Sequence, residues 1–273
     1  MMNKSRITRG FVYLGAGITF GFLGFIILFV LIKGVPYIQP SLFAWNYTTE
    51  NVSLMPSLIT TLYVIGGSLL IAGPIGIFTA IYLVEYADRS KLIVKLIAMA
   101  TDTLAAVPSI VYGLFGFLFF VTYLELQFSL IAGIATTTIM VLPLIIRSTE
   151  EALLSVGRPL REASFALGAG KLRTIFNVVL PVAMPGILSG VILATGRIIG
   201  ESAALIYTLG SSSNLPESFF SSGRTLAVHM YVLSSEGFYV NEAYATAVVL
   251  LVVVLSLNGL STLVGRKLAK GGK

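Results

Sequence analysis

The chain consists mainly of long apolar runs, separated by shorter segments that carry almost all of its charged residues. Six runs approach or exceed the roughly 20 residues that a helix needs to cross the hydrocarbon core of a bilayer. They lie at Phe11–Ile32, Leu58–Val84, Val107–Leu124, Phe128–Ile146, Gly186–Leu209 and Ala243–Val264. Backbone polar groups in lipid must be hydrogen-bonded within their own segment, so each run is predicted to be a helix. The predicted fold class is all-α, a polytopic membrane protein with six transmembrane helices.

Two segments between the runs have a pattern of their own. Leu92–Ala100 places its apolar residues on one helical face, which suits an interfacial helix, an early extension of the third span, or a buried connecting helix. Arg147–Met184 is the longest connection on its side of the predicted membrane. The whole chain, residues 1–273, is predicted to be one transmembrane domain that includes the loop 147–184.

The basic residues predict the orientation. Fifteen of the 18 Lys and Arg residues lie in one set of connections, residues 1–10, 85–106, 147–185 and 265–273. The opposite connections, residues 33–57 and 210–242, hold only Lys33 and Arg224, and Arg197 lies inside the fifth run. Because Lys and Arg accumulate in cytoplasmic loops, both termini are predicted to be cytoplasmic.

Composition supports lipid as the main solvent and excludes several function classes. The chain is 56% apolar and 11% charged, whereas soluble domains carry roughly 25% charged residues. It has no cysteine and one histidine, His229, so a disulfide framework, a thiolate site and a His-rich metal site are excluded. The net charge of +6 sits at the ends of apolar runs, so the expected partner is the bilayer and not nucleic acid. Asp102 is isolated, and no catalytic constellation is visible.

The loop at 147–184 is predicted to form two short helices joined at a glycine elbow. Pro159 suits the first position of a helix, and Gly168 suits the residue after a helix end. A second helix is predicted from Lys171 to Val179, ended by Leu180 and Pro181. The elbow presents small or apolar residues, namely Ala163, Ala166, Leu167 and Ala169. They suit docking into a groove of another protein, although an ordinary connecting loop is the alternative.

Two charges lie inside the fifth apolar run. Arg197 is about 16 Å into a hydrocarbon core of roughly 30 Å, and Glu201 is predicted on the same helical face one turn later. Charges at that depth normally face a water-filled path or each other. In one interpretation the two side chains only neutralise each other. In the other, Arg197 offers its planar guanidinium to an anion with several oxygens, and Glu201 keeps that anion from binding too tightly.

The loop resembles a family of transport proteins. Permeases of binding-protein-dependent ABC importers carry Glu-Ala-Ala, three residues, Gly, nine residues and Ile-x-Leu-Pro. The same spacing occurs here, with Ser for the second Ala and Val for Ile. The matching residues are Glu162, Ala163, Ser164, Gly168, Val178, Leu180 and Pro181. The resemblance implies a type I ABC importer permease fold, and it implies that Glu162, Ala163, Ser164, Gly168, Leu180 and Pro181 couple the chain to an ATPase subunit.

A narrower resemblance comes from the fifth run. Gly196-Arg197-Ile-Ile-Gly200-Glu201 is similar to the phosphate-importer permeases of the PstA and PstC types. The stretches at 76–86, 107–116 and 142–152 resemble the PstA type. This resemblance implies Arg197 and Glu201 as substrate-path residues in a prokaryotic inner (plasma) membrane. It also implies three partners: a PstC-like second permease, two copies of the ATPase, and an external phosphate-binding protein.

No nucleotide site is expected in this chain. Gly168-Ala-Gly-Lys171 superficially resembles a phosphate-binding loop, but Phe165 and Leu172 stand where that motif needs Gly and Ser or Thr. ATP and Mg²⁺ are therefore expected on the partner ATPase, with no cofactor in this chain. Two alternatives stay open. One is the permease of a sulfate, molybdate or phosphonate importer, and the other is an ion-coupled secondary transporter or channel.

Overall fold

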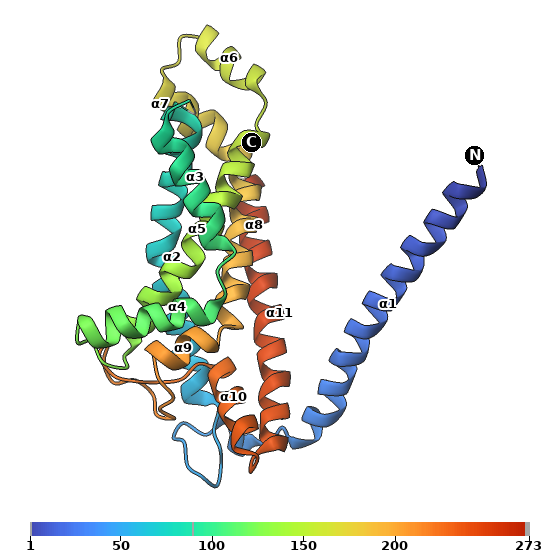
Figure 1. Ribbon diagram of the computed structural model, residues 1–273, viewed down its shortest axis with the longest axis vertical. Coiled ribbons are helices and arrows are strands. Elements are labelled where there is room, and N and C mark those ends of the chain that lie inside the picture. The colour runs from blue at the N-terminus through green and yellow to red at the C-terminus, as the bar shows by residue number, and fades with distance from the viewer. Residues whose placement is uncertain (1, 89, 271–273) are drawn as a thin grey trace.

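The computed structural model describes residues 2–88 and 90–270, with side chains for residues 9–88 and 90–263. Arg89 and Lys273, two basic residues of the predicted cytoplasmic segments, lie outside the described residues. All regular elements in the described ranges are helical, which confirms the predicted all-α class (Figure 1).

In the described part of the chain, six long helices are joined by shorter helical pieces. The long helices are α1 (Met2–Gly34), α2 (Met55–Ile81), α3 (Leu92–Ala105), α5 (Leu130–Ser155), α8 (Leu180–Ile199) and α11 (Val240–Lys270). The shorter ones are α4 (Ser109–Gly116), α6 (Arg158–Ala166), α7 (Lys171–Thr174), α9 (Ala203–Thr208) and α10 (Leu226–Glu236). Two 3₁₀ turns, η1 (Val35–Tyr37) and η2 (Pro40–Phe43), follow α1. The π-helical turns η3 (Tyr82–Tyr86), η4 (Phe117–Tyr123) and η5 (Ile175–Val179) continue α2, α4 and α7.

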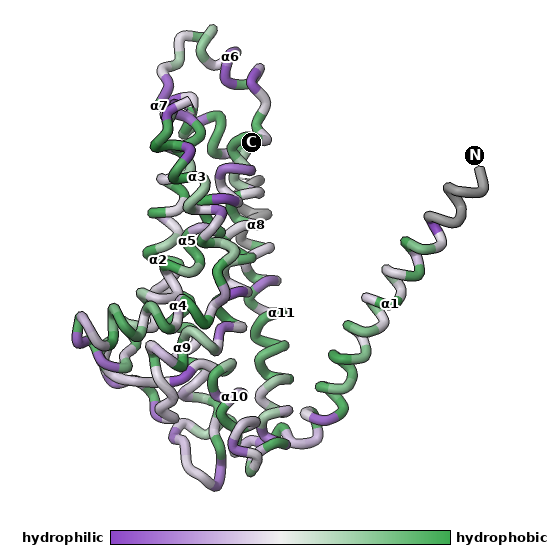
Figure 2. The backbone as a smooth tube through the Cα atoms, viewed as in Figure 1, coloured by the Kyte–Doolittle hydropathy of each residue, from purple (hydrophilic) through white to green (hydrophobic). Residues whose placement is uncertain are grey.

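The core lies where α2, α5 and α8 pack together. Small residues bring these helices close, because a Cβ at Gly76 would lie 2.7 Å from Ile145 and one at Gly190 would lie 1.8 Å from the Ser148 hydroxyl. Around these contacts, Met140, Ile145 and Ile198 are buried in one apolar cluster. Hydrophobic residues dominate the middle of the helices, and hydrophilic ones gather toward the ends of the molecule (Figure 2).

Within the described residues, five helical segments are long and apolar enough to cross a membrane, and a bent pair can supply a sixth crossing. Four of them, Arg9–Tyr37, Met55–Tyr86, Leu130–Ser155 and Val240–Leu263, overlap the predicted first, second, fourth and sixth spans. The fifth is Lys171–Ile199, which begins and ends earlier than the predicted run 186–209.

The predicted third span, Val107–Leu124, is helical from Ser109 to Tyr123, but this segment is too short to cross a membrane by itself and supplies a crossing only together with α3. The chain bends by 102° between α3 and the segment Ser109–Tyr123. Pro108 lies at the bend, where its missing N–H and its steric effect on the preceding residue end α3. The segment Leu92–Ala100 is therefore part of the first limb of the bent pair, and this limb packs along α5 (Figure 1).

Helix α1 stands away from the bundle along most of its length (Figure 1). It contacts α11 only near its last turns, where the rings of Phe29 and Tyr244 meet edge to face at 6.0 Å. A Cβ at Gly34 would lie 2.3 Å from the Tyr244 carbonyl oxygen, so the close approach requires glycine there. From Arg9 onward, the described part of the chain therefore leaves most of the apolar surface of α1 uncovered.

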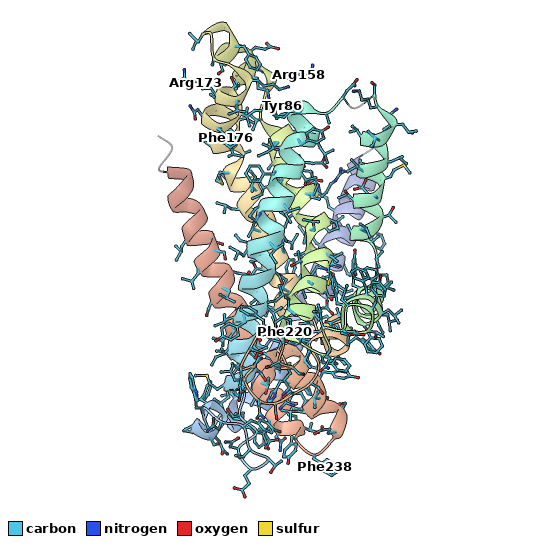
Figure 3. All side chains as sticks on the ribbon, turned by 90° about the vertical axis from the view of Figure 1, so that its left-hand side faces the viewer. Tyr86, Arg158, Arg173, Phe176, Phe220 and Phe238 are labelled. Carbon is cyan, nitrogen blue, oxygen red and sulfur yellow. The ribbon has the colours of Figure 1, made fainter. Side chains whose placement is uncertain are left out.

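The two ends of the molecule differ in what they carry. The start of α1 and the end of α11 lie toward the end that bears α6 (Figure 1). Tyr86, Arg158, Arg173 and Phe176 lie at this α6 end, and Phe238 lies at the opposite end, near α10 (Figure 3). Termini on the same side agree with an even number of crossings.

Candidate functional site

The glycine elbow at the α6 end has the predicted local geometry. Pro159 lies in the first turn of α6, and Gly168, just beyond its last residue Ala166, has a φ of +82°. Glycine is favoured in this left-handed conformation because it lacks a Cβ. Leu167 is 89% exposed, and Glu162, Ala163 and Ala166 are exposed as well. The elbow therefore offers an apolar tip that nothing in the described chain covers.

A hydrogen bond closes the base of the elbow. Ser164 is buried, and its hydroxyl lies 2.9 Å from the hydroxyl of Thr174 in α7. Next to this contact, the Lys171 ammonium lies 4.5 Å from the ring centroid of Tyr86. The serine that replaces the family's second alanine thus holds the two arms of the elbow together.

An arginine that the sequence did not single out ties the elbow to the bundle. Arg161 of α6 donates from Nε and Nη2 to Glu85 Oε1, at 3.2 and 2.8 Å. It also donates to the carbonyl oxygens of Leu153 and Val156 at the end of α5, at 2.9 and 2.5 Å. One guanidinium therefore joins the ends of α2, α5 and α6. Arg161 and Glu85 are 76 positions apart, so sequence spacing gave no sign of the contact.

The predicted end of the second loop helix at Leu180 and Pro181 is wrong. The chain stays helical from Lys171 to Ile199, through the π-helical turn η5 and into α8. Pro181 lies in the first turn of α8, where a missing N–H is tolerated, and the wider π turn precedes it. Leu180 packs against the buried cluster of Ile175 and Val179, while Pro181 is exposed.

The predicted continuous helix through Arg197 and Glu201 is also wrong. Helix α8 ends at Ile199 with Gly200 as its C-cap, and α9 begins only at Ala203. The two charges therefore do not share a helical face, and the described residues contain no ion pair between them. The apolar run continues through residues 200–202, so its periodicity does not reveal that the helix ends there.

Glu201 has a local partner in the break. Its side chain is buried, and Oε1 accepts a hydrogen bond from the backbone N–H of Ala204 at 3.0 Å. This N–H has no acceptor within α9, because it belongs to the first turn. The carboxylate therefore caps α9 and fixes where the new helix starts.

Arg197 instead lines a cavity of about 570 Å³ between α8, α11 and α5. The cavity is also lined by Leu144, Ser189 and Asn258. Arg197 is half-buried, and the described part of the chain offers its guanidinium neither an ion pair nor a hydrogen bond. A cation in an apolar bundle without a counter-ion is the arrangement expected of a site for an anion.

Asn258 is a second polar residue of this cavity, and sequence reasoning missed it. It comes from α11, it is half-buried, and its Oδ1 is buried without a hydrogen-bond partner among the described residues. A lone amide within the apolar run 243–264 is itself a signal, because polar groups in membrane helices usually serve a path or a contact.

The helices that follow the two breaks, α4 and α9, pack against each other. A Cβ at Gly113 of α4 would be 2.8 Å from the Ala204 Cα, and one at Gly116 would be 2.6 Å from Thr208. The limb after the bend at Pro108 therefore packs directly on α9. Non-helical backbone within a membrane is tolerated where protein buries it or where it lines a cavity. In the break after α8, Glu201 is buried, and Gly200 and Ser202 line a cavity.

Comparison of the sequence with known proteins gives consistent matches. The family described as binding-protein-dependent transport system inner membrane component matches residues 72–270. The chain is 31% identical to the probable ABC transporter permease protein YqgI of Bacillus subtilis, over 96% of this chain and 97% of that protein. It is 32% identical to the phosphate transport system permease protein PstA of Haemophilus influenzae, over 93% of this chain and 91% of that protein.

Solved structures resemble the fold. A chain of the MetNI methionine ABC transporter in an inward-facing conformation matches with a TM-score of 0.60 at 19% identity, covering 79% of this chain and 94% of that one. A chain of a bacterial ABC transporter involved in the import of alginate matches with a TM-score of 0.62 at 17% identity, covering 92% and 95%. At these identities the likeness concerns the fold alone.

Proposed function

The chain belongs to the family of binding-protein-dependent transport system inner membrane components and is the permease subunit of an ABC importer, and from this premise we propose that it carries phosphate. The PstA protein of Haemophilus influenzae and further relatives named PstA support phosphate as the substrate. The Gly196–Glu201 segment at the end of α8 supports it from the sequence side.

The observation that carries the proposal is the unpaired guanidinium of Arg197 in its cavity. A guanidinium presents parallel N–H donors that match two oxygens of a tetrahedral oxyanion. With no carboxylate of the described chain paired to Arg197, its charge is available to an entering anion. A neutral sugar or an apolar amino acid would leave that cation without compensation, which is costly in an apolar bundle.

Asn258 is proposed to assist Arg197. Its amide lies across the same cavity, and an amide N–H can donate to an oxyanion without adding charge. Glu201 is still proposed as a residue of the substrate path, but its role differs from the one expected from the sequence. Because its carboxylate caps α9, it fixes the position of the break beside Arg197 and does not neutralise Arg197.

The elbow is proposed as the docking element for the ATPase. Leu167 and its neighbours Ala163 and Ala166 form an exposed tip small enough to enter a groove. Glu162, Ser164, Gly168, Leu180 and Pro181 belong to the same proposed coupling region. Hydrolysis of ATP, with Mg²⁺, is assigned to that partner, of which two copies are expected in the complex.

A second permease of the PstC type is proposed to complete the membrane part. The uncovered surface of α1 and the cavity on the α8 and α11 side leave room for another membrane subunit. An external phosphate-binding protein is proposed to deliver the substrate at the α10 end.

The α6 end is proposed to face the cytoplasm, with both termini. Cysteine substitutions test this cleanly, because the chain has no native cysteine. A cysteine at Ser218, exposed near the α10 end, should react with an impermeant maleimide added to intact cells, and a cysteine at Arg158 in α6 should not. The reverse labelling pattern would overturn the orientation.

The decisive test of function is transport by the purified complex. The tagged chain should co-purify with an ATPase and a second permease, and vesicles containing them should accumulate labelled phosphate when ATP and the binding protein are supplied. An excess of unlabelled phosphate should compete, whereas sulfate, molybdate and phosphonate should not. Uptake of one of these oxyanions in place of phosphate would favour the related importer, and uptake without any ATPase would refute the ABC assignment.

A further inference from the structure

Arg224, which lies shortly before α10, is a second cation without an ion-pair partner among the described residues. Arg224 is only 5% exposed, and its Nε and Nη2 are buried without a hydrogen-bond partner. Among the described side chains it forms no ion pair with an acidic residue. Burial of a guanidinium without an anion is unfavourable, and binding of a counter-ion removes much of that cost.

The groups around Arg224 compensate little of this cost. Its guanidinium carbon lies 4.8 Å from the ring centroid of Tyr47, a cation–π contact that offsets only part of the cost. His229 is fully buried and meets the Tyr47 ring edge to face at 6.3 Å. Burial, and next the nearby charge of Arg224, lower the pKa of His229 to about 3, although the Val52 backbone offsets part of the shift. The imidazole is therefore neutral at physiological pH and adds no second positive charge.

Tyr47 connects this cluster to an open cavity of about 340 Å³ at the α10 end. The cavity lies between two connections and is lined by Trp45, Asn46, Tyr47, Asn214 and Glu217, among others. The backbone beside Arg224 touches the same wall, because a Cβ at Gly223 would lie 2.6 Å from Pro216, which also lines the cavity. The Tyr47 ring therefore both contacts the Arg224 guanidinium and forms part of the cavity wall.

We propose that Arg224 is an oxyanion-binding site at the outer mouth of the permease, entered through this cavity and covered by Tyr47 in the structure described. The inference rests on the proposed function in one respect, since phosphate is the anion that would pass from Arg224 toward Arg197. The chemistry follows from the residues themselves. A buried planar fork with unsatisfied donors, beside a neutral histidine and an aromatic lid, suits a small tetrahedral anion.

A fluorescent label at Asn46→Cys, on the cavity wall, reports binding in the purified complex whose partner chains carry no reactive cysteine. Titration with inorganic phosphate, without ATP or binding protein, should give a saturable signal. Arg224→Gln should weaken the apparent affinity about tenfold or more, because a charged donor is lost. The charge-matched control Lys33→Gln, in the exposed outer segment, should leave the signal unchanged.

Arg224→Lys distinguishes a loss of binding from a folding defect, because it keeps the positive charge and loses only the planar guanidinium. It should weaken phosphate binding by a smaller factor than Arg224→Gln. An equal titration in wild type and Arg224→Gln would overturn the proposal, as would the same signal from sodium chloride. Phosphate uptake by wild type combined with any of these results would reject the outer site alone, whereas absent uptake would reject the proposed function.

Discussion

The elbow after α6 and the break after α8 each contain a glycine at a helix end, yet only the elbow had the shape that the sequence predicted. At the elbow, Pro159 and Gly168 mark both ends of α6, and Gly168 adopts a φ of +82°. At the break, Gly200 ends α8 with an ordinary right-handed conformation, φ −82° and ψ −2°. The elbow is specified by local stereochemistry, whereas the break depends on what surrounds it.

The difference shows how the two regions are maintained. The elbow needs few contacts beyond Ser164 with Thr174 and Arg161 with Glu85. The break depends on a buried carboxylate cap and on the packing of α9 against Gly113. Substitutions at the elbow are therefore expected to affect coupling to ATP hydrolysis. Substitutions at the break are expected to affect phosphate transport at Arg197 and stability at Glu201.

The largest expected effect is at Arg197. Arg197→Gln should lower phosphate uptake by about tenfold to a hundredfold, because the cavity loses a charge-assisted donor. Thermal stability should hardly change, since Glu201 has its own partner and is not left unpaired. Uptake in vesicles and thermal unfolding of the same preparation measure both. A loss of stability in Arg197→Gln that Glu201→Gln restores would instead establish a structural ion pair.

The next effect is at the elbow. Gly168→Val forces a β-branched side chain into a positive φ, which costs roughly 1–3 kcal/mol, and it changes the direction of the docking tip. Uptake should fall several-fold, with ATP hydrolysis no longer stimulated by the binding protein. Gly170→Val is the matched control, because Gly170 has a φ of −70° and open space around it. Equal losses of uptake in Gly168→Val and Gly170→Val would contradict the proposed role of the left-handed conformation at Gly168.

A smaller effect is expected where Arg161 joins the elbow to the bundle. Arg161→Gln should destabilise the α6 attachment by roughly 2 kcal/mol, because it removes charge-assisted hydrogen bonds. We expect more ATP to be hydrolysed for each phosphate transported, with assembly intact. Arg173→Gln, an exposed arginine of α7, is the control. Exchange of the charges, Glu85→Arg with Arg161→Glu, should restore part of the coupling. A normal ratio of ATP hydrolysed to phosphate transported in Arg161→Gln would show that the contact between Arg161 and Glu85 does not contribute to coupling.

The sequence predicted what depends on local or one-dimensional patterns. Apolar runs gave the helical class and four of the spans, and the Pro159 and Gly168 signals gave the elbow. The predictions that failed concern bends and contacts that depend on how distant parts of the chain pack. The bend at Pro108 separates the predicted third span from α3, but a proline does not always interrupt a helix, as Pro143 inside α5 shows. The contact of Arg161 with Glu85 joins residues 76 positions apart, and the partner of Glu201 depends on a helix break that periodicity does not reveal.

The smallest expected effect is at Glu201, and it distinguishes a cap from a path residue. Glu201→Ala leaves the Ala204 N–H without its acceptor, and loss of such a cap costs about 1 kcal/mol, a shift of a few degrees in the unfolding temperature.

Glu201→Gln retains an amide oxygen that can accept the same hydrogen bond, so it should keep most of the stability and most of the uptake. Glu236→Gln, at the exposed end of α10, controls for the loss of one negative charge. If Glu201 acted by moderating the attraction between Arg197 and phosphate, Glu201→Gln would instead tighten phosphate binding and slow its release. Unfolding temperature and uptake rate, measured together, distinguish the two roles, because a cap depends on the acceptor oxygen and a moderator depends on the charge.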